Sequence, residues 1–149
     1  MDVVSVEAKT IKGLKIRTRN QDEMNPDTAQ IPAFVQKVDQ LVTIDYPAGA
    51  RAYSVYFNYE SDVNGAYDLL MGSDKVAASE VALESITIQA GHYLKFSGQG
   101  EFPQAIIDTW QRIWAYFTSD ECQHTRRYTT DFEYYEGPDA VSIYIAIDN

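Results

Sequence analysis

Cysteine and histidine are nearly absent from this chain of 149 residues, which contains one Cys and two His. Because Cys122 stands alone, no intramolecular disulfide can form, and the sequence favours a reducing compartment. Cys122 and His124 make only half of a metal-binding pair, and His92 lies far away in the sequence. We therefore expect neither a metal ion nor a cofactor, and we interpret Cys122 as a small apolar thiol near a loop.

Basic residues are also scarce, with 12 Lys and Arg against 22 Asp and Glu, for a net charge of -10. Direct nucleic-acid binding needs clustered basic residues, so the charge balance argues against it. No apolar run approaches the length of a membrane span. The opening residues, Met1 to Val4, lack the basic region and apolar core of a signal peptide. We expect a cytoplasmic protein that binds no membrane.

Familiar catalytic motifs are missing as well. The sequence has no Gly-x-Ser-x-Gly motif, and Cys122 has no base placed beside it. Residues 62–65 (Asp-Val-Asn-Gly) are similar to part of a calcium loop, but no Glu follows at the required distance. We interpret that segment as a turn.

Tyrosine, by contrast, is abundant, with 11 residues against 6 Phe and 2 Trp. Tyrosine combines a wide, stiff contact area with a polar tip, so an excess suits a binding surface as well as a core. The hydrophobic fraction of 45% is that of an ordinary globular protein. The length predicts one domain covering residues 1–149.

Hydrophobic periodicity predicts the same succession of elements twice. In each half, a strand interrupted at glycine is followed by an amphipathic helix and a hairpin. A glycine inside a strand pattern predicts either a bulge or a close approach of the backbone to its neighbour. The first half (about 1–78) pairs with the second (about 79–149) by matching Gly13 with Gly91, Phe34 with Trp110, and residues 56–59 with 132–135. We therefore predict an α+β fold, a duplicated β-α-β-β unit with pseudo-two-fold symmetry, in which an antiparallel sheet carries two main helices and a ligand groove lies between the halves. The expected elements are strands at 2–19, 53–59, 67–71, 86–88 and 92–96, helices from about 26–29 to 41 and from 103 to 117, and a C-terminal hairpin at 132–136 and 141–147. Pro32 is an alternative first turn of the first helix.

The order of several segments resembles one known family. These segments are residues 11–18, residues 53–57 with 65–67 and 71–72, the Ala-Gly-x-Tyr-x-x-Phe strand at 90–96, Trp110 with Trp114, and Phe-Glu-x-Tyr at 132–135 before the strand at 143–147. The chain resembles the effector-binding domains of AraC- and MerR-type transcription activators, also called GyrI-like small-molecule-binding domains. The family often has Pro where this chain has Ala146. The resemblance covers nearly the whole chain and leaves no room for a helix-turn-helix module, so it is closest to free-standing bacterial members.

This resemblance implies a hydrophobic, aromatic-lined pocket in which an acidic residue faces a lipophilic organic cation. The acidic residue of the family's Phe-Glu-x-Tyr strand corresponds to Glu133. Rings that could join it in ligand binding are those of Tyr135, Trp110, Tyr59, Phe57, Tyr46 and Tyr144. We expect Trp114, Tyr93 and Phe96 to be packing residues instead.

Glu133 has two interpretations from the sequence alone. Strand alternation places it on one face with Asp131 and Tyr135, and places Phe132 and Tyr134 on the other. It is either a solvated carboxylate that protects an edge strand from aggregation, or the acid of a binding pocket. The family resemblance favours the pocket.

Three functions remain open at this stage. The first is non-enzymatic binding of drug- or dye-like cations, in transcriptional regulation or drug sequestration. The second is a small-molecule hydrolase in which Glu133 is the general base and Tyr135 assists. The third is an interaction module that holds a protein partner, and a homodimer is also open.

Overall fold

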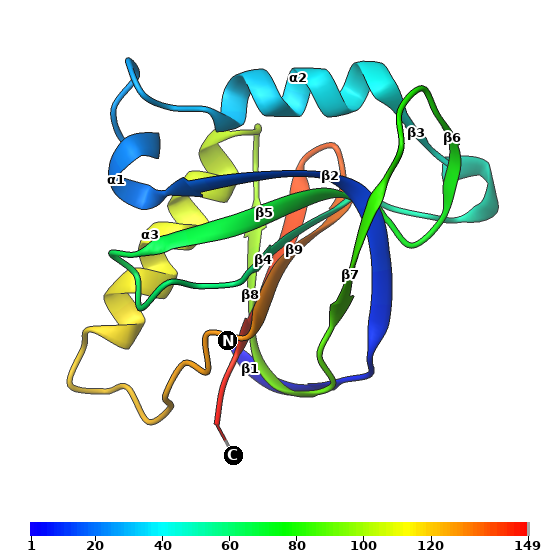
Figure 1. Cartoon of the computed structure of the whole chain (residues 1–149). Coiled ribbons are helices and arrows are strands. Elements are labelled where there is room, and N and C mark those ends of the chain that lie inside the picture. The colour runs from blue at the N-terminus through cyan, green and yellow to red at the C-terminus, as the bar shows by residue number, and fades with distance from the viewer. Residues whose placement is uncertain (149) are drawn as a thin grey trace.

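The computed structural model describes residues 1–148, and those residues form ten strands, three α-helices and one 3-10 turn (Figure 1). The strands are β1 (Asp2–Val6), β2 (Lys9–Arg19), β3 (Val42–Ile44), β4 (Tyr53–Phe57), β5 (Ala66–Ser73), β6 (Val76–Ser79), β7 (Glu84–Ile88), β8 (Gly91–Gln99), β9 (Thr130–Gly137) and β10 (Ala140–Ala146). The helices are α1 (Asn20–Glu23), α2 (Ile31–Leu41) and α3 (Gln104–Phe117), and the 3-10 turn η1 is Tyr46–Ala48.

Eight strands form one curled antiparallel sheet in the order β1-β8-β10-β9-β4-β5-β2-β7 (Figure 1). This order is symmetric about the β9–β4 pair. Each half contributes three adjacent strands, and the strand before each set crosses to the other half: β1 pairs with β8, and β7 pairs with β2. The α+β fold with an antiparallel sheet and two main helices is therefore confirmed.

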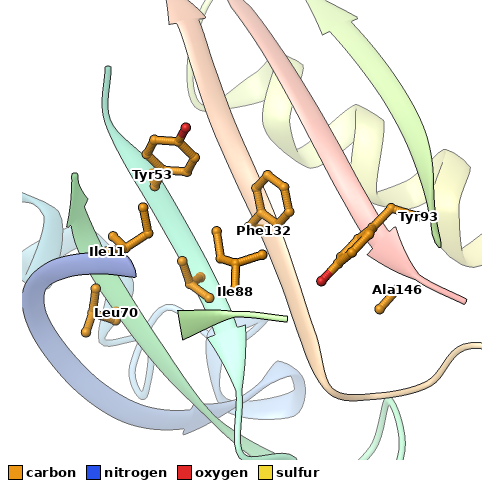
Figure 2. Packing of buried hydrophobic residues seen from close by; sticks show 8 residues of the cluster. Ile11, Tyr53, Leu70, Ile88, Tyr93, Phe132 and Ala146 are labelled. Atoms are coloured by element: carbon orange, nitrogen blue, oxygen red, sulfur yellow. The ribbon is translucent and has the colours of Figure 1, made fainter. Parts of the chain in front are cut away.

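The two faces of the sheet carry different layers. On one face, α2 packs over Leu69 and α3 packs over Ile143, each in its own hydrophobic cluster. On the other face, the sheet curls around a third cluster (Figure 2). That cluster consists of Ile11, Tyr53, Val55, Leu70, Ile88, Tyr93, Phe132 and Ala146. The strand alternation seen in the sequence thus separates helix-facing side chains from those inside the curl.

The chain departs from the predicted elements in several places. Gly13 does not interrupt β2; the break between β1 and β2 comes at Glu7 and Ala8. A Cβ on Gly13 would lie 2.0 Å from the carbonyl oxygen of Met71, so this glycine permits a close approach of β2 to β5. The short two-stranded sheet of β3 and β6 was not predicted.

The start of α2 is set by a side chain outside the helix. The Glu23 carboxylate accepts hydrogen bonds from the backbone N–H groups of Gln30 (3.1 Å) and Ile31 (2.9 Å). These donors are among the unpaired groups of a helix N-terminus, where a negative charge is favoured. The helix therefore begins at Ile31, with Pro32 in its first turn, rather than near Pro26.

Candidate functional site

A cavity of about 530 Å³ lies over the helix-bearing face of the sheet, between α2 and α3. Helix α2 contributes Ile31 and Val35, and α3 contributes Ile106, Trp110 and Trp114. A second hollow of about 1030 Å³ shares wall residues with it, including Ile31, Val35 and Ile106. The two hollows together make one groove whose opposite walls come from the two halves of the fold.

Glu133 is buried in the floor of this cavity with only 2% of its surface exposed. It lies on β9, and β10 and β4 flank that strand on both sides, so Glu133 is in the middle of the sheet. Glu133 is therefore not an edge-strand carboxylate, and its role as the acid of a binding site stays a prediction. A buried carboxylate requires hydrogen-bond donors, because its hydration is lost.

Aromatic side chains supply those donors. Tyr56 Oη donates to Glu133 Oε2 at 2.8 Å, and the indole Nε1 of Trp110 donates to the same oxygen at 2.6 Å. Tyr135 donates to Oε1, and its hydroxyl also contacts Ser54 Oγ at 2.7 Å. Sheet and helix α3 thus hold one carboxylate in a fixed orientation.

Burial raises the pKa of Glu133 above its ordinary value, and the hydrogen bonds from Trp110, Tyr135 and Tyr56 offset part of that rise. Burial beside Glu133 likewise raises the pKa of the Tyr56 and Tyr135 hydroxyls far above their usual range. Both phenols therefore keep their protons and remain donors. Among residues 1–148, no Lys or Arg forms an ion pair with Glu133.

Asp131 lies two positions before Glu133 on the same face of β9 and is fully buried. Its Oδ2 pairs with Arg126 Nη2 at 2.8 Å and accepts a hydrogen bond from Tyr59 Oη at 2.5 Å. Its Oδ1 accepts the backbone N–H of Ala146 at 2.8 Å. Burial of the Arg126 side chain lowers its pKa, but Asp131, Tyr59 and Tyr128 together have the larger, opposite effect and raise the pKa of Arg126. Asp131 is thus charge-balanced, whereas Glu133 is not.

The structure brings together four of the seven side chains proposed from the sequence. Glu133, Tyr135, Trp110 and Tyr59 all line the 530 Å³ cavity. Tyr46, which is 53% exposed, instead lines the neighbouring 1030 Å³ hollow.

Phe57 and Tyr144 do not line either hollow, which corrects the expectation that they join the site. Both pack on the cluster inside the curl, where the Tyr144 ring stacks on Phe132 at 4.5 Å. The internal repeat matched residues 56–59 with 132–135, which made Phe57 the counterpart of Glu133. In the structure, the side chains of these two residues lie on opposite faces of the sheet. Asn58 explains part of the error: its φ of 53° lies in the left-handed region, so alternation does not continue through it to Tyr59.

Several cavity residues were missed. Trp114 was expected to be core, but it lines the cavity beside Trp110, with ring centroids 5.9 Å apart. Tyr56 was not singled out, although strict alternation along β4 from Ser54 would have placed it on the Glu133 face. Arg126 and Tyr128 precede β9 in an irregular segment, where no periodicity indicates orientation. The expected packing roles of Tyr93 and Phe96 agree with their burial.

No group of His, Cys, Asp and Glu in residues 1–148 has the arrangement of a metal site. Within the same residues, no helix is long and apolar enough to cross a membrane. Cys122 is partly buried, and its thiol contacts the carbonyl oxygen of His124 at 3.0 Å.

Comparison with known proteins shows the family of this chain. The profile of a family described as Cass2, integron-associated effector binding protein, matches residues 2–147. The chain belongs to this effector-binding family. A solved integron cassette protein from the mobile metagenome of Vibrio cholerae is 37% identical, with a TM-score of 0.87 over 99% of this chain and 95% of the other.

Two further relatives extend the comparison. YobU of Bacillus subtilis strain 168, named as a candidate transcriptional regulator, is 28% identical over 97% of this chain and 96% of its own length. SAV2435, solved with bound tetraphenylphosphonium, is 15% identical, with a TM-score of 0.67 over 99% of this chain and 93% of the other. At that identity, the likeness to SAV2435 shows a shared fold.

Proposed function

We propose that this protein binds lipophilic organic cations in the cavity between α2 and α3, with Glu133 as the counter-charge, and that it does so without chemical turnover. The observation that carries the proposal is the buried Glu133 carboxylate, which has hydrogen-bond donors around it and no cationic partner among the described residues. Membership of an effector-binding family and the tetraphenylphosphonium bound to SAV2435 support it.

The physical basis is the uncompensated negative charge of the buried Glu133 carboxylate, which a cationic ligand can neutralise. Desolvation of a carboxylate is unfavourable by several kcal/mol, and hydrogen bonds from neutral donors restore only part of this. A cation that enters the cavity supplies the missing charge. The rings of Trp110, Trp114 and Tyr59 can add cation–π attraction of roughly 0.5–2 kcal/mol each, depending on desolvation. A delocalised cation with apolar substituents sheds water more readily than a small ammonium ion does, so the cavity favours drug- and dye-like molecules.

The biological role follows from this binding activity. A protein that captures such cations can report them to a transcription system through a partner, or can lower their free concentration. The name of YobU supports the regulatory role. Flat aromatic walls accept many shapes, which suits recognition of several drugs rather than one.

The test is titration of the purified protein with tetraphenylphosphonium, followed by the fluorescence of its two Trp residues, both of which line the cavity. Glu133→Gln should weaken binding about tenfold to a hundredfold, the range expected from losing a charge-assisted contact of about 1.5–3 kcal/mol. Glu84→Gln is the matched control, because it makes the same charge change at a half-exposed side chain paired with Lys15 outside the cavity.

Equal affinity in wild type and Glu133→Gln would refute the proposed counter-charge. The hydrolase alternative uses the same Glu133–Tyr135 pair, and it is distinguished by recovering the ligand. A cationic ester returned unchanged after long incubation supports binding alone, whereas hydrolysis that stops in Glu133→Gln would establish a general base.

A further inference from the structure

Arg126 is a basic side chain in the wall of the same cavity as Glu133, which Glu23 and Asp62 also line. Its side chain is only 7% exposed, and its Nη2 pairs with Asp131. Arg126 lies in the segment before β9, where an isolated bridge joins it to Ile147, the residue after β10. The guanidinium is therefore held in place from both sides.

The hydrogen-bonding capacity of this guanidinium is largely unused. A guanidinium has five N–H donors, and the hydrogen bond to Asp131 uses one of them. The Nε atom of Arg126 is buried without any acceptor. A buried donor without a partner is unfavourable, so an acceptor brought by a ligand would be stabilised here.

Two tyrosine rings fix the guanidinium at the cavity wall. The Tyr128 ring lies 4.4 Å from the Arg126 guanidinium, and the Tyr59 ring meets Tyr128 edge-on at 5.3 Å. Tyr128 has a φ of 54°, and the residue before Tyr59, Asn58, has a φ of 53°. Left-handed backbone is uncommon for residues other than glycine, and such strain concentrates at functional sites.

The charges determine which acceptor fits. Asp131 and Arg126 compensate each other, whereas the other carboxylates that line the cavity, Glu133, Glu23 and Asp62, add only negative charge. Glu133 is the buried one of these three, and a monocation compensates its charge. A ligand that also carried a carboxylate would leave one buried negative charge uncompensated, near both Asp131 and Glu133. The acceptor that matches Arg126 is therefore an uncharged oxygen.

We propose that Arg126 is a specificity-determining residue that donates a hydrogen bond to a neutral acceptor, such as a carbonyl or ester oxygen, on a lipophilic monocation whose charge is held by Glu133. This inference rests on the proposed function and narrows its ligand class. Strand geometry gives the scale: the α-carbons of residues 131 and 133 are about 7 Å apart. A ligand of this class carries its cation and its acceptor at separate ends.

Three dyes with the same xanthylium cation test this. Tetramethylrhodamine methyl ester has the neutral acceptor, tetramethylrosamine lacks it, and tetramethylrhodamine has a free carboxylate in its place. We expect the ester to bind about tenfold more tightly than the rosamine, the scale of one hydrogen bond to a charged group. The carboxylate form should bind more weakly than the ester. Fluorescence anisotropy of each dye gives the three dissociation constants.

Variants of Arg126 distinguish a hydrogen bond to the ligand from a purely structural role of this side chain. Arg126→Met combined with Asp131→Asn removes both charges together, so no buried ion is left unpaired, and Arg126→Lys keeps the positive charge beside Asp131 but loses the planar donor fork. Both should abolish the preference for the ester over the rosamine. Arg127→Met is the matched control, because Arg127 is 38% exposed and pairs with Asp148 outside the cavity.

The outcomes distinguish the two proposals. If the ester preference survives in both Arg126 variants while Glu133→Gln weakens both cationic dyes, the role of Arg126 is overturned and the cation site stands. If both dyes lose affinity equally in the Arg126 variants, Arg126 only supports the fold of the site, which also overturns the inference. If neither cationic dye binds the wild-type protein, the proposed function itself fails.

Discussion

Two carboxylates on one strand show how the site divides its charges. Asp131 and Glu133 lie on the same face of β9, and both are buried. Asp131 is compensated by Arg126 within the chain, whereas Glu133 receives hydrogen bonds from neutral aromatic donors and no cation. Asp131 is therefore neutralised within the chain, and Glu133 is the carboxylate that we propose as the counter-charge of a ligand.

The free energy of unfolding should depend on pH in a way that shows the burial of Glu133. Because its folded-state pKa is raised above the ordinary value of 4.5, the folded chain holds this proton more tightly than the unfolded chain does. Its favourable contribution is present below pH 4.5 and is lost as the pH rises through the raised pKa. At neutral pH, Glu133→Gln should therefore be at least as stable as wild type, and the difference should vanish or reverse in acid. Urea unfolding over a pH series measures this; a Gln variant that is less stable at neutral pH would contradict it.

Cation binding should show the opposite dependence on pH. Only the ionised carboxylate attracts a cation, so affinity for tetraphenylphosphonium should fall tenfold per pH unit once the pH is below the raised pKa of Glu133 in the free protein. The Glu133→Gln variant should bind weakly and with no such slope. Calorimetric titration at several pH values checks both, and proton release on binding should be measurable in the same range. A wild-type affinity that does not change with pH would contradict the role of Glu133 as the counter-charge of the cation.

At the scale of elements, the position of α3 determines how closely the Trp110 side chain approaches Glu133. Gly98 on β8 allows the helix to approach, because a Cβ there would lie 2.0 Å from Thr109 Oγ1 and 3.2 Å from the Ala105 carbonyl oxygen. Thr109 is fully buried and precedes Trp110 on the helix. The contact between β8 and α3 thus sets the distance between the Trp110 indole and Glu133.

Gly98→Ala should move α3 away from the sheet and affect both stability and binding. We expect a loss of about 1–3 kcal/mol of unfolding free energy, the usual result of overpacking, together with weaker cation binding. Adding Thr109→Ala removes the clashing oxygen and should recover part of both losses, which a double-mutant cycle in urea and in ligand titration would measure. Gly137→Ala is the control, since a Cβ there meets nothing within 4 Å. Unchanged binding in Gly98→Ala would show that α3 does not position the site.

At the scale of the whole molecule, the net charge of -10 assists the proposed ligand. A negative protein concentrates cations around itself and speeds their association, and salt screens this attraction over a length of about 10 Å at 0.1 M. The same charge suits neither a nucleic-acid partner nor an anionic ligand. The proposed cation site in the groove and the net charge of the protein therefore favour the same class of ligand, a lipophilic cation.

The association rate of a cationic dye should consequently fall several-fold when salt is raised from about 0.01 M to 0.3 M, while its dissociation rate changes little. Stopped-flow fluorescence with tetramethylrosamine measures both rates. A neutral dye of similar size should show no such decrease. Equal salt dependence for the two dyes would mean that the protein's field does not guide the ligand.

The sequence determined the kinds of elements, whereas the choice of Glu133 as the central acid came from the family resemblance. Period-two patterning around Glu133 and the apolar stripe of α3 are local properties, because each depends only on side chains that follow one another along a strand or helix. Repetition of those patterns was sufficient to predict a duplicated α+β fold with a groove. Gly13 was also recognised as unusual, although its close contact with β5 could not be separated from a break in the strand.

Only the tertiary structure decided which side chains share the cavity. Phe57 and Tyr59 are two residues apart in the sequence, yet the left-handed backbone at Asn58 puts Tyr59 in the cavity and leaves Phe57 inside the curl. The pairing of Asp131 with Arg126 depends on how an irregular segment folds back beside β9. Burial, charge balance and pKa all arise from such contacts between distant segments, and no pattern along the chain contains them.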